Sequence, residues 1–299
     1  MYKKGMLLFN DKAGQEDVHK NVGVAAGIIS KIVDELIIIK GKNPGDLEKI
    51  CRERGEEADL LCIMGGDGTV HDCVNGLVHL SNPPVISVLP SGTCNDFARS
   101  LNLPANISEA AGSAVKGFTK KIDIGYANDR TFINFAGIGL ITDTSENINK
   151  EMKEWVGSFS YLMSAMKTVN ETEPFHYKIR LPDEELEGEA VMIALLNGKY
   201  IGTRELPFEG ISLLDRQLNL VVVKEGGLSL FIEWIQRKTP FSKETENNNL
   251  ILRETSDVHI ALPEDKKADT DGEVYLRSPL KCGIIEKPLE FICGEKEEN

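Results

Sequence analysis

Four short apolar runs in the first half of the chain constrain its fold more than any other feature. They cover Gly5–Phe9, Glu35–Ile39, Leu60–Met64 and Val85–Leu89, and stretches with helical spacing of apolar residues lie between them. Strands of this kind that alternate with helices are typical of a parallel sheet covered on both faces. We therefore expect an α/β domain over residues 1–124.

Helix starts can be placed from local signals in the same segment. Asn43-Pro44 resembles a cap followed by proline at the first helical position, which predicts a helix that runs to Arg54. Further helices are predicted over Val70–Leu77, from about Asn95, and over Ser108–Lys116.

After Asp123 the pattern changes to short strands separated by turn-rich loops. The predicted strands are Thr131–Phe135, His176–Leu181, Glu189–Leu196, Leu218–Val223 and Val258–Leu262. Long helices are expected only at Ser145–Asn170, which carries an apolar stripe, and at Leu228–Arg237. This half predicts a β-rich, antiparallel, sandwich-like domain over residues 125–299. Its extreme C-terminus is free to pack back on the first domain.

Charge narrows the classes of partner. The 299 residues carry 34 Lys and Arg against 47 Asp and Glu, a net charge of −13, which argues against nucleic-acid binding and permanent membrane anchoring. The longest apolar stretch, Ala190–Leu196, is too short to span a bilayer, so a cytoplasmic location is expected. Local lysines permit transient, salt-sensitive visits to the inner membrane surface; they are Lys116, Lys120, Lys121, Lys150, Lys153 and Lys167.

The strongest chemical motif is Gly65-Gly66-Asp67-Gly68-Thr69, between a predicted strand and a predicted helix. Glycines at the carboxyl end of a strand let backbone N–H groups approach a phosphate, and the following helix N-terminus favours an anion. Asp67 fits beside a phosphate if Mg²⁺ lies between them. The plain structural alternative is a tight turn in which Asp67 caps its own helix. His71 follows in that helix and is close enough to contact phosphate or ribose, although a helical histidine that faces solvent is the favoured interpretation.

Two other loops should lie at the same edge of the sheet. Asn10–Gly14 follows the first predicted strand, and Pro90–Arg99 follows the fourth. Loops at the carboxyl ends of parallel strands converge on one crevice, so together with Gly65–Thr69 they could surround one nucleotide triphosphate. Taken separately, Asn10–Gly14 is an ordinary turn and Asn95 an ordinary N-cap.

The motifs in combination resemble the diacylglycerol kinase catalytic-domain family, specifically its bacterial soluble lipid kinases. The resemblance rests on Gly65–Thr69, Gly92–Arg99, Asp123-Ile124-Gly125 and Asp271-Gly272-Glu273, and it extends from Asn10 to Glu273. The glycine–aspartate turn is shared with NAD kinases and is only moderately specific, whereas Asn95–Arg99 is much more so. On residues alone, Asp271-Gly272-Glu273 is better interpreted as a hairpin turn, and Asp123 as a strand-end residue.

The resemblance implies a role for each matching residue. ATP would be held by residues of the glycine loops and their neighbours, namely Asn10, Gly14, Gly65, Gly66, Gly68, Thr69, Gly92 and Thr93. Asp67 would interact with nucleotide-bound Mg²⁺, and Asp96 with Asp123 would form a carboxylate network beside it. Glu273 would be the general base that accepts the proton of the attacking hydroxyl. Phosphoryl transfer needs positioning, a metal and a carboxylate of this kind.

The resemblance also implies a structural Mg²⁺ in the β-rich domain. Asp215 would bind it, with Ser212 and Gln217 offering backbone carbonyls, but Arg216 stands where the family usually has glycine and its charge opposes a metal. Other departures are Asp11-Lys12 where proline is common, Cys94 where glycine is common, and Gly202–Glu205 where the family is glycine-rich.

These residues predict an ATP- and Mg²⁺-dependent lipid kinase that converts diacylglycerol, or a similar lipid, to its phosphate in the cleft between the domains. One alternative is a phosphotransferase like NAD kinase, which would not be expected to carry Asn95–Arg99 or Asp271-Gly272-Glu273. The other is a catalytically silent protein that binds nucleotide or lipid. The sequence leaves open whether the chain forms a homodimer. Its six cysteines are expected to be buried, reduced thiols.

Overall fold

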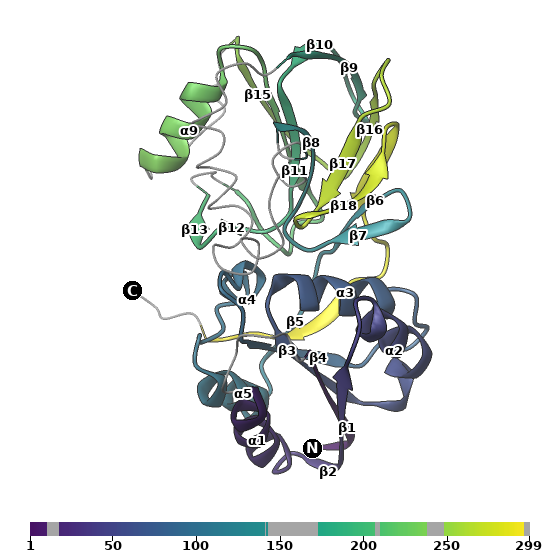
Figure 1. Ribbon diagram of the computed structural model, residues 1–299, viewed down its shortest axis with the longest axis vertical. Coiled ribbons are helices and arrows are strands. Elements are labelled where there is room, and N and C mark those ends of the chain that lie inside the picture. Colours follow the sequence, from purple (N-terminus) through teal and green to yellow (C-terminus); the bar gives the residue numbers. More distant parts are fainter. Residues whose placement is uncertain (11–17, 141, 143–172, 207–209, 238–247, 296–299) are drawn as a thin grey trace. The chain divides into compact units, whose positions relative to one another are not determined.

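The chain divides into two compact units in the computed structural model, which describes residues 1–10, 18–140, 142, 173–206, 210–237 and 248–295. The first unit comprises Met1–Ile122 and Lys287–Asn299, and the second comprises Asp123–Glu286 (Figure 1). The chain therefore enters the second unit at Asp123 and leaves it after Glu286. The predicted helix Ser145–Asn170 and its apolar stripe fall outside the described residues.

A six-stranded, mostly parallel sheet forms the centre of the first unit. In spatial order its strands are β2 (Val33–Gly41), β1 (Tyr2–Asn10), β3 (Leu60–Gly65), β4 (Val85–Pro90), β20 (Leu289–Ile292) and β5 (Thr119–Ile122). Neighbours from β2 to β20 run parallel, and β20 pairs with β5 antiparallel. The last strand of the chain therefore completes the first sheet.

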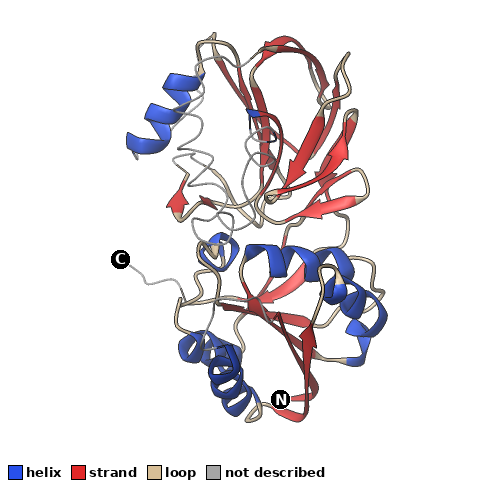
Figure 2. Cartoon of the chain, viewed as in Figure 1, coloured by secondary structure: helices blue, strands red, loops and turns tan. Residues whose placement is uncertain are grey.

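Helices cover both faces of this sheet, as Figure 2 shows. They are α1 (Val18–Ile29), α2 (Asp46–Arg54), α3 (Asp67–Leu77), α4 (Asp96–Ser100) and α5 (Ile107–Lys116), with a 3-10 turn at Gly55–Glu57. Helices α1 and α5 pack together, as do α2 and α3. Alternate residues of the strands point to opposite faces, so Leu7, Phe9 and Cys62 share one buried cluster with Ala25 of α1 and Ala110 of α5.

The predicted start of α2 at Asn43-Pro44 is wrong. The helix begins at Asp46, after Gly45 in the left-handed conformation with φ of 80°. The Asp46 carboxylate accepts hydrogen bonds from the backbone N–H groups of Asn43 at 2.9 Å and Lys42 at 3.0 Å. These bonds, the one from Asn43 first, lower the pKa of Asp46. The turn before α2 is thus closed by the side chain of the first helical residue instead of by Asn43.

Two antiparallel sheets make up most of the second unit. One has the strand order β10 (Glu185–Ala190), β9 (Phe175–Arg180), β16 (Asp257–Ala261), β19 (Leu280–Ile284), β6 (Gly125–Ala127) and β7 (Arg130–Phe132). The other has the order β15 (Leu250–Thr255), β14 (Leu218–Val223), β11 (Met192–Leu196), β8 (Phe135–Gly139), β17 (Lys267–Thr270) and β18 (Glu273–Arg277). A small hairpin joins β12 (Tyr200–Ile201) to β13 (Arg204–Glu205).

The two sheets share an apolar core to which both contribute alternate residues. Tyr177 and Val258 from the first sheet and Ile193 and Leu220 from the second belong to one buried cluster. The other face of the second sheet packs against α9 (Leu228–Arg237) through residues that include Phe231. The structure therefore confirms the predicted fold class, an α/β domain followed by an antiparallel, sandwich-like β-rich region.

Two predicted strands of this region are wrong. Thr131–Phe135 is not a single strand, because β7 ends at Phe132 in one sheet and β8 begins at Phe135 in the other. Glu189–Leu196 is not a single strand, because β10 ends at Ala190 in one sheet and β11 begins at Met192 in the other. The two halves differ in pattern, because β10 has exposed glutamates at alternate positions, whereas β11 is an unbroken apolar run that is buried throughout. This change of pattern at Val191 is the signal that the prediction missed.

Candidate functional site

The register of the first sheet brings the ends of β1, β3 and β4 to the same level. Phe9 pairs with Met64, and Gly65 pairs with Pro90. Beyond these pairs, the backbone N–H of Ser91 donates to the carbonyl of Gly65 at 3.0 Å. The loops after β3 and β4 are therefore joined at the carboxyl edge of the sheet, where ligands of parallel sheets usually bind.

The two glycine loops approach each other backbone to backbone. A Cβ atom added to Gly92 would lie only 2.5 Å from the Cα of Gly66, and one added to Gly66 would lie 3.1 Å from the Cα of Gly92. Real Cβ contacts are longer than this, so this approach requires glycine at position 92 and tolerates a side chain poorly at position 66. Backbone atoms are left at the surface of this contact, which suits a phosphate.

Thr69 and Asn10 extend the same edge. The Thr69 side chain folds over Gly65, since a Cβ there would lie 2.4 Å from the Cβ of Thr69. The Asn10 amide Nδ2 donates to Thr69 Oγ1 at 3.5 Å. Gly68 and Thr93 are exposed beside them, whereas Gly14 falls outside the described residues.

Asp67 is the first residue of α3, three residues before the predicted start of that helix. Its carboxylate does not cap α3. Oδ2 accepts from the backbone N–H of Asp96 at 3.1 Å, and Oδ1 accepts from that of Phe97 at 3.0 Å. These N–H groups belong to the first turn of α4, which has no acceptor within its own helix. Asp67 therefore caps a helix that lies about 30 residues further along the chain.

The predicted N-cap role of Asn95 is wrong for the same reason. Asn95 precedes α4 in the left-handed conformation, with φ of 52°, and its side chain makes no capping bond. Instead, Oδ1 accepts from the N–H of Gly92 at 2.9 Å, and Nδ2 donates to the carbonyl of Gly92 at 2.8 Å. Asn95 thus shapes the glycine loop, and Asp96, 7% exposed, begins the helix beside Asp67.

His71 is also placed differently from the expectation. The side chain is 1% exposed in α3, so the predicted solvent-facing histidine is wrong. Helix α3 is buried over most of its length, so few of its positions face solvent.

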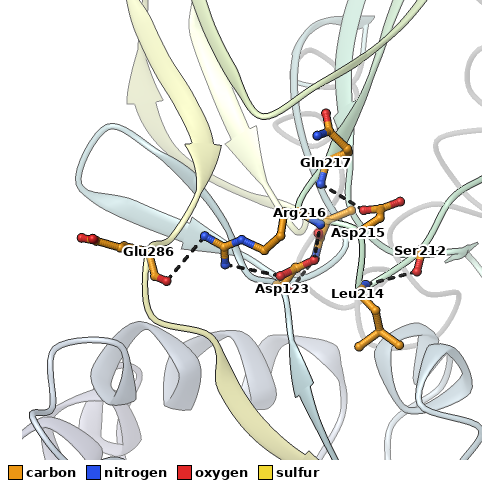
Figure 3. Close-up of polar contacts among 8 residues, drawn as sticks. Asp123, Ser212, Leu214, Asp215, Arg216, Gln217 and Glu286 are labelled. Atoms are coloured by element: carbon orange, nitrogen blue, oxygen red, sulfur yellow. Dashed lines mark hydrogen bonds and ion pairs between the residues drawn. The ribbon is translucent and has the colours of Figure 1, made fainter.

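In the second unit, Asp123 is buried and bound to Arg216 (Figure 3). Oδ2 of Asp123 accepts from the backbone N–H of Arg216 at 2.7 Å, and Oδ1 accepts from its Nη1 at 3.4 Å. The Asn197 amide Nδ2 donates to the carbonyl of Asp123 at 3.0 Å. The predicted network of Asp96 with Asp123 involves both units, so it stays a prediction.

Asp271-Gly272-Glu273 forms the two-residue hairpin between β17 and β18. Asp271 and Gly272 both have positive φ, 53° and 92°, as such a tight turn requires. The Asp271 carboxylate accepts from three successive backbone N–H groups, those of Ile133, Asn134 and Phe135, at 2.8, 2.8 and 3.0 Å. It ties the hairpin to the start of β8 and leaves Glu273, partly exposed, at the beginning of β18.

Comparisons with known proteins indicate the family that the sequence motifs resemble. A family model described as diacylglycerol kinase catalytic domain matches residues 4–127. A crystal structure of a "putative diacylglycerol kinase" from Bacillus anthracis str. Sterne superposes with a TM-score of 0.90 at 36% identity, covering 98% of this chain and 96% of that one. The chain belongs to the diacylglycerol kinase family.

Other family members agree over nearly the full length. A diacylglycerol kinase structure from the same Bacillus strain has a TM-score of 0.87 at 35% identity and covers 98% of this chain and 97% of that one. A Staphylococcus carnosus protein named "Putative lipid kinase" is 29% identical over 296 residues, 97% of each chain. No helix among the described residues is both long enough and apolar enough to span a membrane.

The loop predicted to hold a structural Mg²⁺ contains one carboxylate, Asp215, and a cation of its own, Arg216. Asp215 Oδ1 accepts from the backbone N–H of Gln217 at 3.0 Å, and Ser212 Oγ accepts from that of Leu214 at 3.2 Å. The described residues include no group of three or more His, Cys, Asp or Glu placed to bind a metal. Arg216 lies between Asp215 and Gln217, and it already binds the Asp123 carboxylate. The Asp215, Ser212 and Gln217 site therefore does not fit the ion in this member of the family.

Burial raises the pKa of Asp215; the Gln217 N–H opposes that effect, and the negative charges of Asp123 and Glu254 add to it. The surroundings of this loop are thus negative, and a cation is favoured there. Arg216 is a cation that the chain itself supplies.

Two contributions were not found from the sequence. Asn197, fully buried, links Asp123 to the carbonyl of Ile133, and Arg216 holds the Asp123 carboxylate. Asn197 directly follows the apolar run of β11, so a polar residue at the end of a buried strand was the available signal. Arg216 was noted only as a departure from glycine, a sign of a left-handed backbone position that the structure has at φ of 62°.

Proposed function

We propose that the chain is an ATP- and Mg²⁺-dependent lipid kinase that transfers the γ-phosphate to a lipid hydroxyl, converting diacylglycerol to phosphatidic acid. The observation that carries the proposal is the close contact of the Gly66 and Gly92 loops, with Asp67 between them and the α4 N-terminus. Membership of the diacylglycerol kinase family supports the same reaction. The proposed location is cytoplasmic, with transient contact at the inner membrane surface.

The first unit is proposed to bind the nucleotide. The partly exposed glycines Gly66 and Gly92 and the side chains of Asn10 and Thr69 lie along one edge and suit a chain of phosphates. Backbone N–H groups orient both oxygens of Asp67. Carboxylate oxygens keep further lone pairs when they accept such bonds, so Asp67 fits a nucleotide-bound Mg²⁺, whose role would be to neutralise developing charge.

The second unit is proposed to supply the base. Glu273 directly follows a hairpin turn that is fixed by Asp271, so its backbone position is well defined. A carboxylate in such a place can accept the proton of the lipid hydroxyl as its oxygen attacks phosphorus. Asp96 and Asp123 are proposed to complete the carboxylate set.

Transfer of labelled γ-phosphate, with Mg²⁺ present, tests the proposal. Diacylglycerol in mixed micelles, NAD and glycerol are offered as competing acceptors. Labelled phosphatidic acid supports a lipid kinase, whereas labelled NADP would identify an NAD kinase-like phosphotransferase. Nucleotide binding without transfer to any acceptor would indicate a silent binding protein.

The role of Glu273 is tested by Glu273→Ala. Loss of a general base is expected to lower kcat about 100-fold while ATP affinity stays within about twofold. Glu264→Ala, which removes an exposed carboxylate from the same unit, is the matched control and should keep wild-type turnover. Near-normal turnover of Glu273→Ala would remove Glu273 from the mechanism.

A further inference from the structure

Arg216 joins the two places where the chain crosses into and out of the second unit. Its backbone N–H and Nη1 bind the carboxylate of Asp123, the first residue of that unit. Its Nη2 donates to the backbone carbonyl of Glu286, the last residue of the unit, at 3.5 Å. Figure 3 shows the guanidinium lying between these two partners, which are 163 positions apart in the sequence (286 − 123).

The partners differ in exposure in a way that favours this ion pair. The Asp123 side chain is 3% exposed, whereas that of Arg216 is 46% exposed. A buried carboxylate needs a cation or several N–H donors, because its own hydration has been lost. Arg216 delivers both from one residue, while its side chain stays partly exposed to water.

Local backbone geometry commits the loop to this arrangement. Arg216 has φ of 62°, in the left-handed region where residues other than glycine pay a steric cost. Glycine would relieve that cost but would supply no side chain. The loop therefore retains a strained arginine at a position that leads its guanidinium back to Asp123.

We propose that the Arg216 guanidinium is a built-in cation that takes the place of a bound divalent ion in the 212–217 loop and holds Asp123 in position. The negative charges of Asp123, Asp215 and Glu254 lie close together, so a cation among them is favoured. A guanidinium and a metal ion compete for that position. Removal of the guanidinium should consequently turn this loop into a divalent-ion site that uses Asp215.

Binding of Mn²⁺ without nucleotide tests this, with free Mn²⁺ measured by electron paramagnetic resonance on the full chain. Mn²⁺ serves as a probe for Mg²⁺ because both prefer oxygen ligands. Wild type should show no binding that depends on Asp215. Arg216→Gly, which suits the left-handed backbone, should gain one Mn²⁺ equivalent with a Kd at or below about 1 mM. Asp215→Asn in the Arg216→Gly background should abolish the gain.

Two matched controls separate charge from backbone. Arg216→Lys keeps a cation and should gain no site. Thr203→Gly places glycine at another left-handed position of the same unit, with φ of 70°, and should also gain none. Circular dichroism checks that every variant is folded.

Two results would overturn the proposal. Binding of Mn²⁺ by wild type that depends on Asp215 would mean that the guanidinium and the ion coexist. Alternatively, a folded Arg216→Gly variant that binds no Mn²⁺ would show that Arg216 does not take the place of a bound ion in this loop. Neither result depends on transfer of phosphate, so both are distinguishable from failure of the proposed kinase activity.

Discussion

Gly92→Ala tests whether the contact between the two glycine loops organises the candidate nucleotide site. The added methyl group would lie 2.5 Å from Gly66 Cα and 3.0 Å from Asn95 Oδ1. Carbon atoms prefer a separation of about 3.5–4.0 Å, so the loops must move apart by about 1 Å. Neither neighbour can rotate away, because one is backbone and the other is held by two bonds to residue 92 itself.

The expected cost follows from these contacts. Overpacking of a rigid site costs about 1–3 kcal/mol, and separation of the loops also weakens the bond from Ser91 N–H to the Gly65 carbonyl, now 3.0 Å long. We expect Gly92→Ala to lower the stability of the first unit by about 2–3 kcal/mol, which corresponds to a fall in Tm of about 5–10 °C. Affinity for an ATP analogue should fall together with stability, since the same backbone is displaced.

Gly68→Ala is the matched control within the same motif. A Cβ at Gly68 meets no atom within 4 Å, and alanine is favoured over glycine inside a helix by up to about 1 kcal/mol. Thermal unfolding without nucleotide, followed by circular dichroism, should place this variant at or above wild-type stability. The reasoning is refuted if Gly92→Ala unfolds at the wild-type temperature, or if Gly68→Ala is equally destabilised.

Three further predictions concern single groups. Asp67→Ala should lose about 1 kcal/mol of stability as well as activity, whereas Asp67→Asn should keep most of the stability and still lose turnover; unfolding and kinase assays on both variants check this. Because backbone N–H groups, that of Asn43 first, lower the folded-state pKa of Asp46, its contribution to stability should be present above its unfolded pKa of about 4 and be lost as pH falls through the folded value. The difference in urea midpoint between wild type and Asp46→Asn should therefore shrink from pH 7 to pH 3. Burial raises the pKa of Cys62, Cys94 and Cys282 to about 12, so a thiol reagent at pH 8 should react fully only after urea is added.

Much of the first unit follows from its sequence because the relevant signals are local. The apolar runs lie in β1 to β4, and glycines lie where strands end. The last strand is different: β20 completes the sheet between β4 and β5, a pairing across the whole chain that no local pattern contains. The change of sheet at Val191 does have a local signal that the prediction did not use: glutamates at alternate positions of β10 give way to the unbroken apolar run of β11.

The sequence identified candidate residues of the site, but it did not predict which groups their side chains bind. The sequence singled out Asp67, Asn95 and Asp271. On residues alone, Asp67 and Asn95 are interpreted as caps of the helices that follow them, and Asp271 as part of a hairpin turn, which is present. The structure instead connects Asp67 to α4, Asn95 to the Gly92 backbone, and Asp271 to the start of β8. Side-chain capping over long sequence distances depends on tertiary packing, so spacing alone does not reveal it.

These hydrogen bonds decide which substitutions can separate a catalytic role from a structural one. Asp67 and Asp123 each accept bonds from backbone N–H groups of the loops around them, so an alanine at either position removes a structural acceptor together with any catalytic charge. Loss of activity in such a variant would leave the two effects mixed. Asparagine keeps one acceptor oxygen and removes the charge, so it separates them. An Asp67→Asn variant that folds and binds ATP but does not turn over would assign the carboxylate charge to catalysis.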